Sequence, residues 1–498
     1  MKNKNYIFLI FLIVGLTGNA QWQQVGSDIN GEANNSSGKS VSISSDGSIL
    51  AIGTSHSNGN GQDRGHVRVL KNNSGTWEQI GDDIYGEADY DYFGWSVSLS
   101  SDGSIVAIGT PYNDGNGNSA GHVRVFKNNS GIWEQIGEDI DGEAKDDSSG
   151  YSISLSSNGS IVAIGAPFND GIGTSAGHVR VYINNSGIWE QIGDDIDGEA
   201  ARDLSGWSVS LSSDGSIVAV GAQSNDGNGD GAGHVRVFQN NSGIWEQIGE
   251  DIDGEAASDG SGFSVSLSSD GSIVAVGATY NDGNGRNAGH VRVFKNNSGI
   301  WEQIGGDIDG EAEVDLLGWS VSLSSDGSVF AVGAPWNDEN GTSAGHVRVF
   351  QNNSEIWEQI GEDINGKTAG SFYGESISLS SDGSIVAIGS PYNNENGELS
   401  GQVRVFQNDF LIGIIEAQQN PDIFIYPNPT TNSLSVKSEK LKIESITISD
   451  LSGKEILYYK AKIAINEYKT DLSNLENAVY IIRIQTEKDV FTTKIIKR

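Results

Sequence analysis

Cysteine is absent from this chain of 498 residues. Its absence excludes disulfide bonds, thiolate metal sites, cysteine nucleophiles and a lipid-modified N-terminal cysteine together. Basic residues are also scarce, with 30 Lys and Arg against 66 Asp and Glu, which gives a formal net charge of −36. Because so acidic a surface repels phosphate backbones, we expect no nucleic-acid partner.

Long apolar runs are missing as well. The longest, Tyr6 to Leu16, has about eleven residues, whereas a membrane-spanning helix needs about 20, so no transmembrane segment is expected. Two lysines precede this run and small residues follow it, which is the order found in a secretory signal peptide. We predict that residues 1–20 form such a signal and that the mature chain is exported through the periplasm.

Glycine is abundant, with 67 residues, most of which lie within a tandem repeat. A tryptophan that opens the sequence WEQIG, or a variant of it, recurs 55 residues apart once and 56 residues apart five times, which indicates tandem duplication. The seven positions are Trp22, Trp77, Trp133, Trp189, Trp245, Trp301 and Trp357.

Each copy contains four short runs typical of β-strands. In one copy they are Trp95 to Ser100, Ile105 to Gly109, His122 to Phe126 and Trp133 to Gly137, separated by turn residues or loops. Such a sheet is apolar on both faces and must pack between copies of itself. An all-β propeller with four-stranded blades follows.

The two ends of the array indicate how the ring closes. Trp22 to Ile29 reads as a fourth strand with no blade before it, and the last copy supplies only three strands, within Ser376 to Phe406. We therefore predict a seven-bladed β-propeller over residues 21–408 in which the N-terminal strand completes the last blade.

The composition changes after the last repeat. Residues 409–422 read as a linker, and residues 423–498 are richer in Lys and Ile, poor in Gly, and contain several short alternating runs. This pattern predicts a small β-sandwich.

Different copies of the repeat contain Phe93-Gly94, Gly165-Ala166-Pro167 and the GHVRVF strand from Gly121 to Phe126. With these motifs the repeat resembles the FG-GAP repeats of integrin α chains and of many bacterial surface proteins. The resemblance implies a propeller and, in the integrin type, a calcium loop between the first two strands. Here that loop is Ser98 to Gly103, with serines in two ligand places, so calcium is not expected there.

The C-terminal residues contain, in this order, Tyr426-Pro427-Asn428-Pro429, Ile448-Ser449-Asp450, Tyr480-Ile481 and the basic terminal run Lys494 to Arg498. With these motifs they resemble the type A sorting domain of the Bacteroidetes type IX secretion system. The resemblance implies that this domain engages the type IX machinery and that the propeller ends on the cell surface or is released. The residues assigned to the sorting signal are Tyr426, Pro427, Asn428, Pro429, Lys494, Lys497 and Arg498.

The loops sort onto two rims of the propeller, because alternate loops of an antiparallel meander share an edge. One rim has short turns such as SSDGS, and we call it the short-turn rim. The other, the long-loop rim, has loops of about ten residues, such as Pro111 to Ala120 and Asp139 to Gly150, and most of the negative charge. We place the binding face on the long-loop rim.

Acidic residues on this rim form a recurring D-x-D-x-E pattern. Alternating oxygen ligands suit a hard cation such as Ca²⁺, and the alternative interpretation is an acidic rim that is merely solvated. A second calcium candidate is the EF-hand-like start of one loop. The candidate ligands are Asp139, Asp141, Glu143, Asp195, Asp197 and Glu199 for the pattern, and Asp226, Asn228 and Asp230 for the loop.

Aromatic residues open most of the innermost strands, near the axis on the long-loop rim. Aromatic rings beside acidic groups could stack on a sugar and bind its hydroxyls, or they could simply pack between blades. The seven residues at this position are Lys39, Trp95, Tyr151, Trp207, Phe263, Trp319 and Glu375.

Six histidines, one per copy from His66 to His346, open the third strands. They would ring the axis too widely to share one metal ion, so we expect a structural role.

The near-identical copies contain no unique catalytic constellation. We therefore expect a secreted or surface-attached, non-enzymatic binding or adhesion propeller that recognises carbohydrate or protein. The alternative is a polysaccharide-active enzyme with one site at the seam between the first and last blades, where Lys39 and Glu375 break the repetition.

Overall fold

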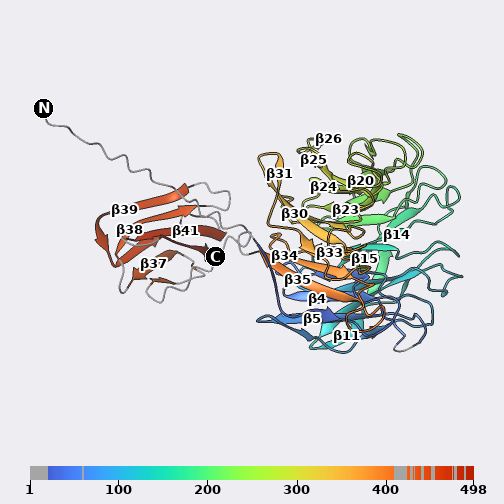
Figure 1. The fold of residues 1–498 in the computed structure, drawn as a ribbon, viewed down its shortest axis with the longest axis horizontal. Helices are drawn as coiled ribbons and strands as arrows, with labels where there is room; N and C mark the ends of the chain where they lie inside the picture. Colours follow the sequence, from blue (N-terminus) through green and yellow to red (C-terminus); the bar gives the residue numbers. More distant parts are fainter. Residues whose placement is uncertain are drawn as a thin grey trace.

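The computed structural model describes residues 21–58, 61–408, 423–426, 430, 432–438, 442–449, 455–473, 475, 479–486 and 490–497. The regular structure of these residues is all β-strand, and seven sheets follow one another along the chain (Figure 1). The predicted signal peptide and linker lie outside the described residues. The all-β fold expected from the sequence is confirmed.

One blade shows how the repeat folds. The strands β8 (Ser96–Leu99), β9 (Ile105–Thr110), β10 (His122–Asn129) and β11 (Ile132–Gln135) pair antiparallel in this order. The fourth strand is broken, and its second piece, β12 (Ile140–Asp141), also pairs with β10. The sequence predicted one unbroken fourth strand; the chain leaves the sheet between Ile136 and Asp139 and then rejoins it.

The other blades repeat this order. The innermost strands are β3 (Ser40–Ile43), β13 (Ser152–Leu155), β18 (Ser208–Leu211), β23 (Ser261–Leu267), β28 (Ser320–Leu323) and β33 (Ser376–Leu379). The second strands are β4 (Ile49–Thr54), β14 (Ile161–Ala166), β19 (Ile217–Ala222), β24 (Ile273–Ala278), β29 (Val329–Ala334) and β34 (Ile385–Ser390). The third strands are β5 (His66–Asn73), β15 (His178–Asn185), β20 (His234–Asn240), β25 (His290–Asn296), β30 (His346–Asn353) and β35 (Gln402–Asn408).

The outer edge of each blade carries the two pieces of the fourth strand. The first pieces are β6 (Thr76–Gln79), β16 (Ile188–Gln191), β21 (Trp245–Gln247), β26 (Trp301–Gln303) and β31 (Ile356–Gln359). The second pieces are β7 (Ile84–Tyr85), β17 (Ile196–Asp197), β22 (Ile252–Asp253), β27 (Ile308–Asp309) and β32 (Ile364–Asn365).

The last blade is completed by the start of the propeller. Strands β1 (Trp22–Gln24) and β2 (Ile29–Asn30) both pair antiparallel with β35. The indole Nε1 of Trp22 donates to the carbonyl of Ile360 in the preceding blade at 2.9 Å. The predicted closure of a seven-bladed ring by the N-terminal strand is confirmed.

The serines of the innermost strands join the blades. Ser96 Oγ donates to the Gly150 carbonyl of the next blade at 2.8 Å, and the N–H of Leu155 donates to Ser98 Oγ at 3.0 Å. The same bonds cross the seam, where Ser376 Oγ donates to the Gly38 carbonyl at 2.9 Å. The polar face of these alternating strands therefore binds the neighbouring blade.

A closed ring of backbone hydrogen bonds encircles the axis on the short-turn rim. In each blade the N–H of the first turn serine donates to the carbonyl of its equivalent in the next blade, and Ser381 to Ser45 closes the ring at 3.0 Å. The ring members are Ser45, Ser101, Ser157, Ser213, Ser269, Ser325 and Ser381. These serines, together with Ile43 and the six leucines at the equivalent position of the other innermost strands, line a cavity of about 160 Å³.

The repeated tryptophans tie each fourth strand to the preceding blade. Trp133 Nε1 donates to the Ile80 carbonyl at 2.8 Å, and the other repeats make the same bond. Trp133 lies opposite Asn128 in the hairpin, because the two-residue turn Ser130-Gly131 sets the register.

The C-terminal strands form two sheets. One sheet contains β36 (Ile423–Tyr426), β37 (Ser433–Ser438) and β40 (Glu467–Asp471), and the other contains β39 (Glu455–Ile465), β38 (Ile443–Ser449), β41 (Val479–Thr486) and β42 (Val490–Ile496). Leu434 and Val436 of the first sheet share a buried cluster with Ile446 and Ile482 of the second. This is the small sandwich that the sequence predicted.

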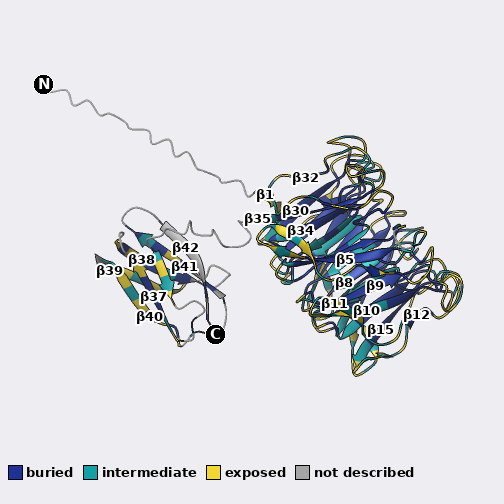
Figure 2. Cartoon of the chain, turned by 90° about the horizontal axis from the view of Figure 1, so that it is seen from below, coloured by how far each residue is buried: buried dark blue, intermediate teal, exposed yellow. Residues whose placement is uncertain are grey.

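Burial follows the layers of each blade. The second strands and the first five residues of the third strands are buried almost throughout, and most of the loops and outer edges are exposed (Figure 2). Gly109 shows why the blades need glycine at the end of the second strand. A Cβ there would lie 2.1 Å from the Gly150 carbonyl oxygen, so only glycine permits this close approach.

Candidate binding face on the long-loop rim

The aromatic residues before the innermost strands contact one another around the axis. Ring centroids are 5.5 Å apart for Trp95 and Tyr151, 4.7 Å for Tyr151 and Trp207, 5.7 Å for Trp207 and Phe263, and 4.7 Å for Phe263 and Trp319. All five side chains are half-buried. These five side chains, which we call the inner aromatic ring, thus contact one another around the axis and remain partly exposed to solvent.

The two charged residues at the same position pair with each other across the seam. Lys39 Nζ lies 2.9 Å from Glu375 Oε1 and 4.5 Å from the ring centroid of Trp95. Burial opposes the charge on Lys39, but the neighbouring Glu375 outweighs it, and the pKa of Lys39 is raised. At the seam, an ion pair therefore occupies the two positions that aromatic side chains occupy in the other blades.

A second set of aromatic residues lies outside the inner ring, two residues beyond the second strands. Tyr112 contacts Trp95 with centroids 5.7 Å apart, and Tyr280 contacts Phe263 at 6.1 Å. The sequence analysis did not single out this set, although its members recur at one repeat position. They are Tyr112, Phe168, Tyr280, Trp336 and Tyr392, and we call them the outer aromatic ring.

Two members of the outer aromatic ring are exposed, whereas all five side chains of the inner ring are half-buried. Trp336 is 41% exposed and Tyr280 is 37% exposed. Trp336 also contacts Phe372, which contacts Tyr392, so the aromatic surface is continuous toward the seam. The long-loop rim therefore carries a continuous set of aromatic side chains, of which Trp336 and Tyr280 are exposed.

The D-x-D-x-E residues are split between two blade interfaces. Asp139 lies 3.6 Å from His122 Nδ1 of its own blade and accepts a hydrogen bond from Gln135 at 2.7 Å. Glu143 lies 3.5 Å from Arg180 Nη1 of the next blade. Asp141 as a whole residue is exposed, but its carboxyl group is partly buried. This partial burial, followed by the charge of Asp139, raises the pKa of Asp141.

The next copy repeats this arrangement. Asp195 lies 3.6 Å from His178 Nδ1, Glu199 lies 3.6 Å from Arg236 Nη1, and the Asp197 carbonyl accepts from Arg236 Nη2 at 2.5 Å. The structure therefore places the first and last acids of each pattern beside different histidines. Calcium binding by these acids stays a prediction.

The EF-hand-like loop is held by its own side chains. Asp226 Oδ1 accepts from the N–H of Gly231 at 2.7 Å, and Asn228 Nδ2 donates to the Gly254 carbonyl at 2.7 Å. Asp226 and Asp230 are exposed. Calcium binding by Asp226, Asn228 and Asp230 also stays a prediction.

The histidines of the third strands are buried between blades and face carboxylates. Burial lowers the pKa of His122 to about 4, and the same holds for His66, His178, His290 and His346. The sequence argument considered only an ion shared among histidines. The structure instead brings each of five histidines within 4.8 Å of carboxylates from two blades, at His122, His178, His234, His290 and His346.

The assigned sorting residues are only partly covered by the described chain. Tyr426 ends β36 and is 46% exposed, whereas Lys497 is 7% exposed and forms a bridge with Thr430. Lys494 lies in β42. Pro427, Asn428, Pro429 and Arg498 lie outside the described residues.

The described residues contain no helix that is long and apolar enough to cross a membrane.

Two known families match parts of this chain. The profile of the FG-GAP repeat matches residues 86–126 and 308–350. The first match begins directly after β7 and the second begins at β27, and both end in a third strand. The profile of the secretion system C-terminal sorting domain matches residues 424–498. No curated protein matches the sequence.

Solved structures with similar folds share little sequence with this chain. One is a protein of Bacteroides uniformis provisionally named 6-phosphogluconolactonase, with 14% identity and a TM-score of 0.46 over 66% of this chain and 85% of that one. Another is U3-55K, with 11% identity and a TM-score of 0.44 over 78% of this chain and 98% of that one.

The fold and the matches together define a class: an exported β-propeller whose blades are sequence repeats. More particularly, the chain carries FG-GAP repeats in its propeller and a type IX secretion sorting domain at its C-terminal end. The sorting domain directs export to the cell surface or the extracellular space.

Proposed function

We propose that the exported propeller is a non-enzymatic binding protein that holds an extracellular carbohydrate on its long-loop rim. The observation that carries the proposal is the pair of concentric aromatic rings, in which Trp336 and Tyr280 are 41% and 37% exposed. Flat aromatic faces stack on sugar rings, and neighbouring carboxylates accept hydrogen bonds from hydroxyl groups. A protein ligand is the other class of partner that this surface would suit.

The seam favours binding over catalysis. Glu375 is the acid that an enzyme would most readily use there, but it is 9% exposed and pairs with Lys39 at 2.9 Å. Lys367, a basic residue beside the seam where the preceding copies have glutamate, pairs with Asp28 at 2.7 Å. Each side chain thus has a structural partner, which supports a non-enzymatic role.

The proposed route to the surface has two steps. Residues 1–20 would direct passage to the periplasm, and residues 423–498 would engage the type IX machinery. Residues 409–422 would separate the propeller of residues 21–408 from the sorting domain.

The test uses the exported full chain on an array of extracellular polysaccharides and glycans. We expect binding that Trp336→Ala weakens about tenfold, the effect of losing roughly 1.4 kcal/mol of stacking. Ile300→Ala is the control, because Ile300 is also exposed, at 63%, but lies in a turn of the short-turn rim. Equal loss in both variants would contradict the placement of the site.

The same samples test the enzymatic alternative. Turnover of any arrayed polysaccharide that Glu375→Gln abolishes would overturn the proposal. Binding to proteins but to no glycan would retain the binding role and replace the ligand class.

A further inference from the structure

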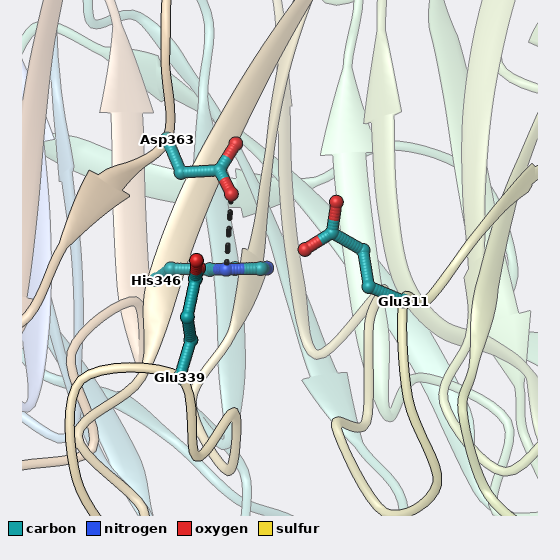
Figure 3. A group of neighbouring side chains, drawn as sticks. All are labelled: Glu311, Glu339, His346 and Asp363. Atoms are coloured by element: carbon teal, nitrogen blue, oxygen red, sulfur yellow. Dashed lines mark ion pairs between the residues drawn. The ribbon is translucent and has the colours of Figure 1, made fainter.

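Four side chains able to ligate a metal ion meet between two neighbouring blades on the long-loop rim. Glu311 follows β27 of one blade, whereas Glu339, His346 and Asp363 belong to the next. Their donor atoms all lie within 4.8 Å of one another. Figure 3 shows the three carboxylate groups gathered around the imidazole of His346. We call this group the His346 cluster.

His346 is a buried side chain without a hydrogen-bond partner. Its relative exposure is 0%, and neither ring nitrogen has a partner among the described residues. The nearest acid oxygen, Asp363 Oδ2, lies 3.7 Å from Nδ1, which is too long for a hydrogen bond. Because a buried polar atom without a partner costs free energy, the cluster is incomplete as it stands.

The cluster also has an excess of negative charge. Three carboxylates face one guanidinium, that of Arg348, whose Nη1 lies 3.5 Å from Glu311 Oε1. Arg348 is held beside the cluster by its bond to the Asp309 carbonyl at 2.5 Å and by the ring of Phe350 beneath it. One guanidinium cannot neutralise three carboxylates, so a further cation would be favourable.

The seam shows what the chain does when the ligands are replaced. There Gln402 takes the place of the histidine, and Lys367 takes the place of the glutamate from the preceding blade. The Lys367 ammonium lies 2.7 Å from Asp28 Oδ2, and Gln402 Nε2 donates to Glu395 Oε2 at 2.9 Å. A cation supplied by the chain itself thus fills the equivalent position in the last blade.

We propose that the His346 cluster binds one divalent transition-metal ion of the zinc class, which joins the two blades. One imidazole nitrogen with three carboxylate oxygens suits Zn²⁺, whose bonds to such ligands are about 2.0 to 2.2 Å long. Calcium instead prefers six to eight oxygen ligands at about 2.3 to 2.6 Å. The exposed glutamates leave an entry path from solvent.

The fourth ligand distinguishes this cluster from its siblings. The other groups contain one Glu, one His and one Asp each, around His122, His178, His234 and His290. Their loops have glycine where this blade has Glu339, at Gly115, Gly171, Gly227 and Gly283. We therefore expect one tight site and weaker binding at the sites with three ligands.

The test measures zinc uptake by the chelator-stripped full chain, by calorimetry and by metal analysis after dialysis. The decisive variant is Glu339→Gly, which converts the loop to the form that its siblings already have and so keeps the fold. The matched control is Glu395→Gly, which removes the equivalent glutamate of the last blade. His346→Gln copies the residue that the last blade carries.

We expect one tight equivalent of zinc in the natural protein and in Glu395→Gly, at least tenfold weaker binding in Glu339→Gly, and its loss in His346→Gln. The thermal unfolding midpoint should rise with zinc only where the tight equivalent binds. Equal zinc affinity in Glu339→Gly and the natural protein would overturn the proposal. Absence of a tight equivalent, or calcium binding as tightly at the same site, would also overturn it. If His346→Gln does not fold, Glu339→Gly alone decides.

Discussion

Replacing Trp22 by alanine tests the closure of the ring. Trp22 is 8% exposed, packs in a cluster with Ile360, Tyr373 and Phe406, and donates to the Ile360 carbonyl at 2.9 Å. A Trp to Ala change at such a site costs about 3 to 5 kcal/mol. Strand β1 pairs with β35 through only three residues, so this loss should detach it.

The same substitution at an internal blade provides the control. Trp245 makes the equivalent bond to the Ile192 carbonyl at 2.8 Å, but its strand is joined to the chain at both ends. Trp245→Ala should therefore lower the free energy of unfolding without freeing a strand. Trp22→Ala should release the N-terminal segment while the other blades stay folded.

Hydrogen exchange and limited proteolysis distinguish these results. In Trp22→Ala, the amides of β35 that face β1 should lose protection, and protease should cut within residues 21–30 before any other site. Trp245→Ala should show neither change. If both variants keep β35 protected and resist cleavage near the N-terminus, the N-terminal strand is not what holds the ring closed.

Three further predictions concern stability and export. Gly333→Ala should destabilise the propeller by about 3 kcal/mol, because the new Cβ would lie 2.2 Å from a carbonyl oxygen of the neighbouring blade; an unchanged urea midpoint would contradict this. The Ser216 side chain and N–H donate to the Asp214 carboxylate and lower its pKa. The charged carboxylate therefore stabilises the fold at pH values above its ordinary pKa of 3.8, and this stabilisation is lost as the pH falls through the lowered pKa of the folded state. Asp214→Asn, which copies the natural Asn158, should be slightly less stable at neutral pH and less sensitive to acid below about pH 4; parallel pH profiles in urea denaturation would count against it. Deleting residues 423–498 should retain the propeller in the periplasm, as measured by cell fractionation, and normal surface display of the truncated chain would refute the role of the sorting domain.

The strand pattern of each blade was predictable because it is local. Period-two alternation from Ser96 to Leu99 and the turn residues after it specify strands and hairpins within one repeat. The absence of a fourth strand from the last copy, together with the unaccompanied strand at Trp22, also indicated how the ring closes. The sorting domain was predictable from motifs in a fixed order near the C-terminus.

Contacts between blades were not predictable in this way. Ser96 and the Gly150 carbonyl are 54 residues apart, and Arg180 and the Asp141 carbonyl are 39 apart, so no local pattern links them. Their meeting depends on how far each blade is rotated against the next. The sequence therefore placed the serines in strands but did not predict their hydrogen bonds to the next blade.

The candidate sites show the same difference between what a local pattern predicts and what the packing of the blades decides. The aromatic residues from Trp95 to Trp319 and the histidines were identified from the sequence, because each set recurs at one position of the repeat. Only the stacking of the blades decided that the aromatic rings contact one another and that His346 meets Glu311 of the preceding blade. The sequence by itself determined the repeat, the strands and the export signal. The tertiary structure decided which side chains face each other across the blade interfaces, since that depends on the packing of whole sheets.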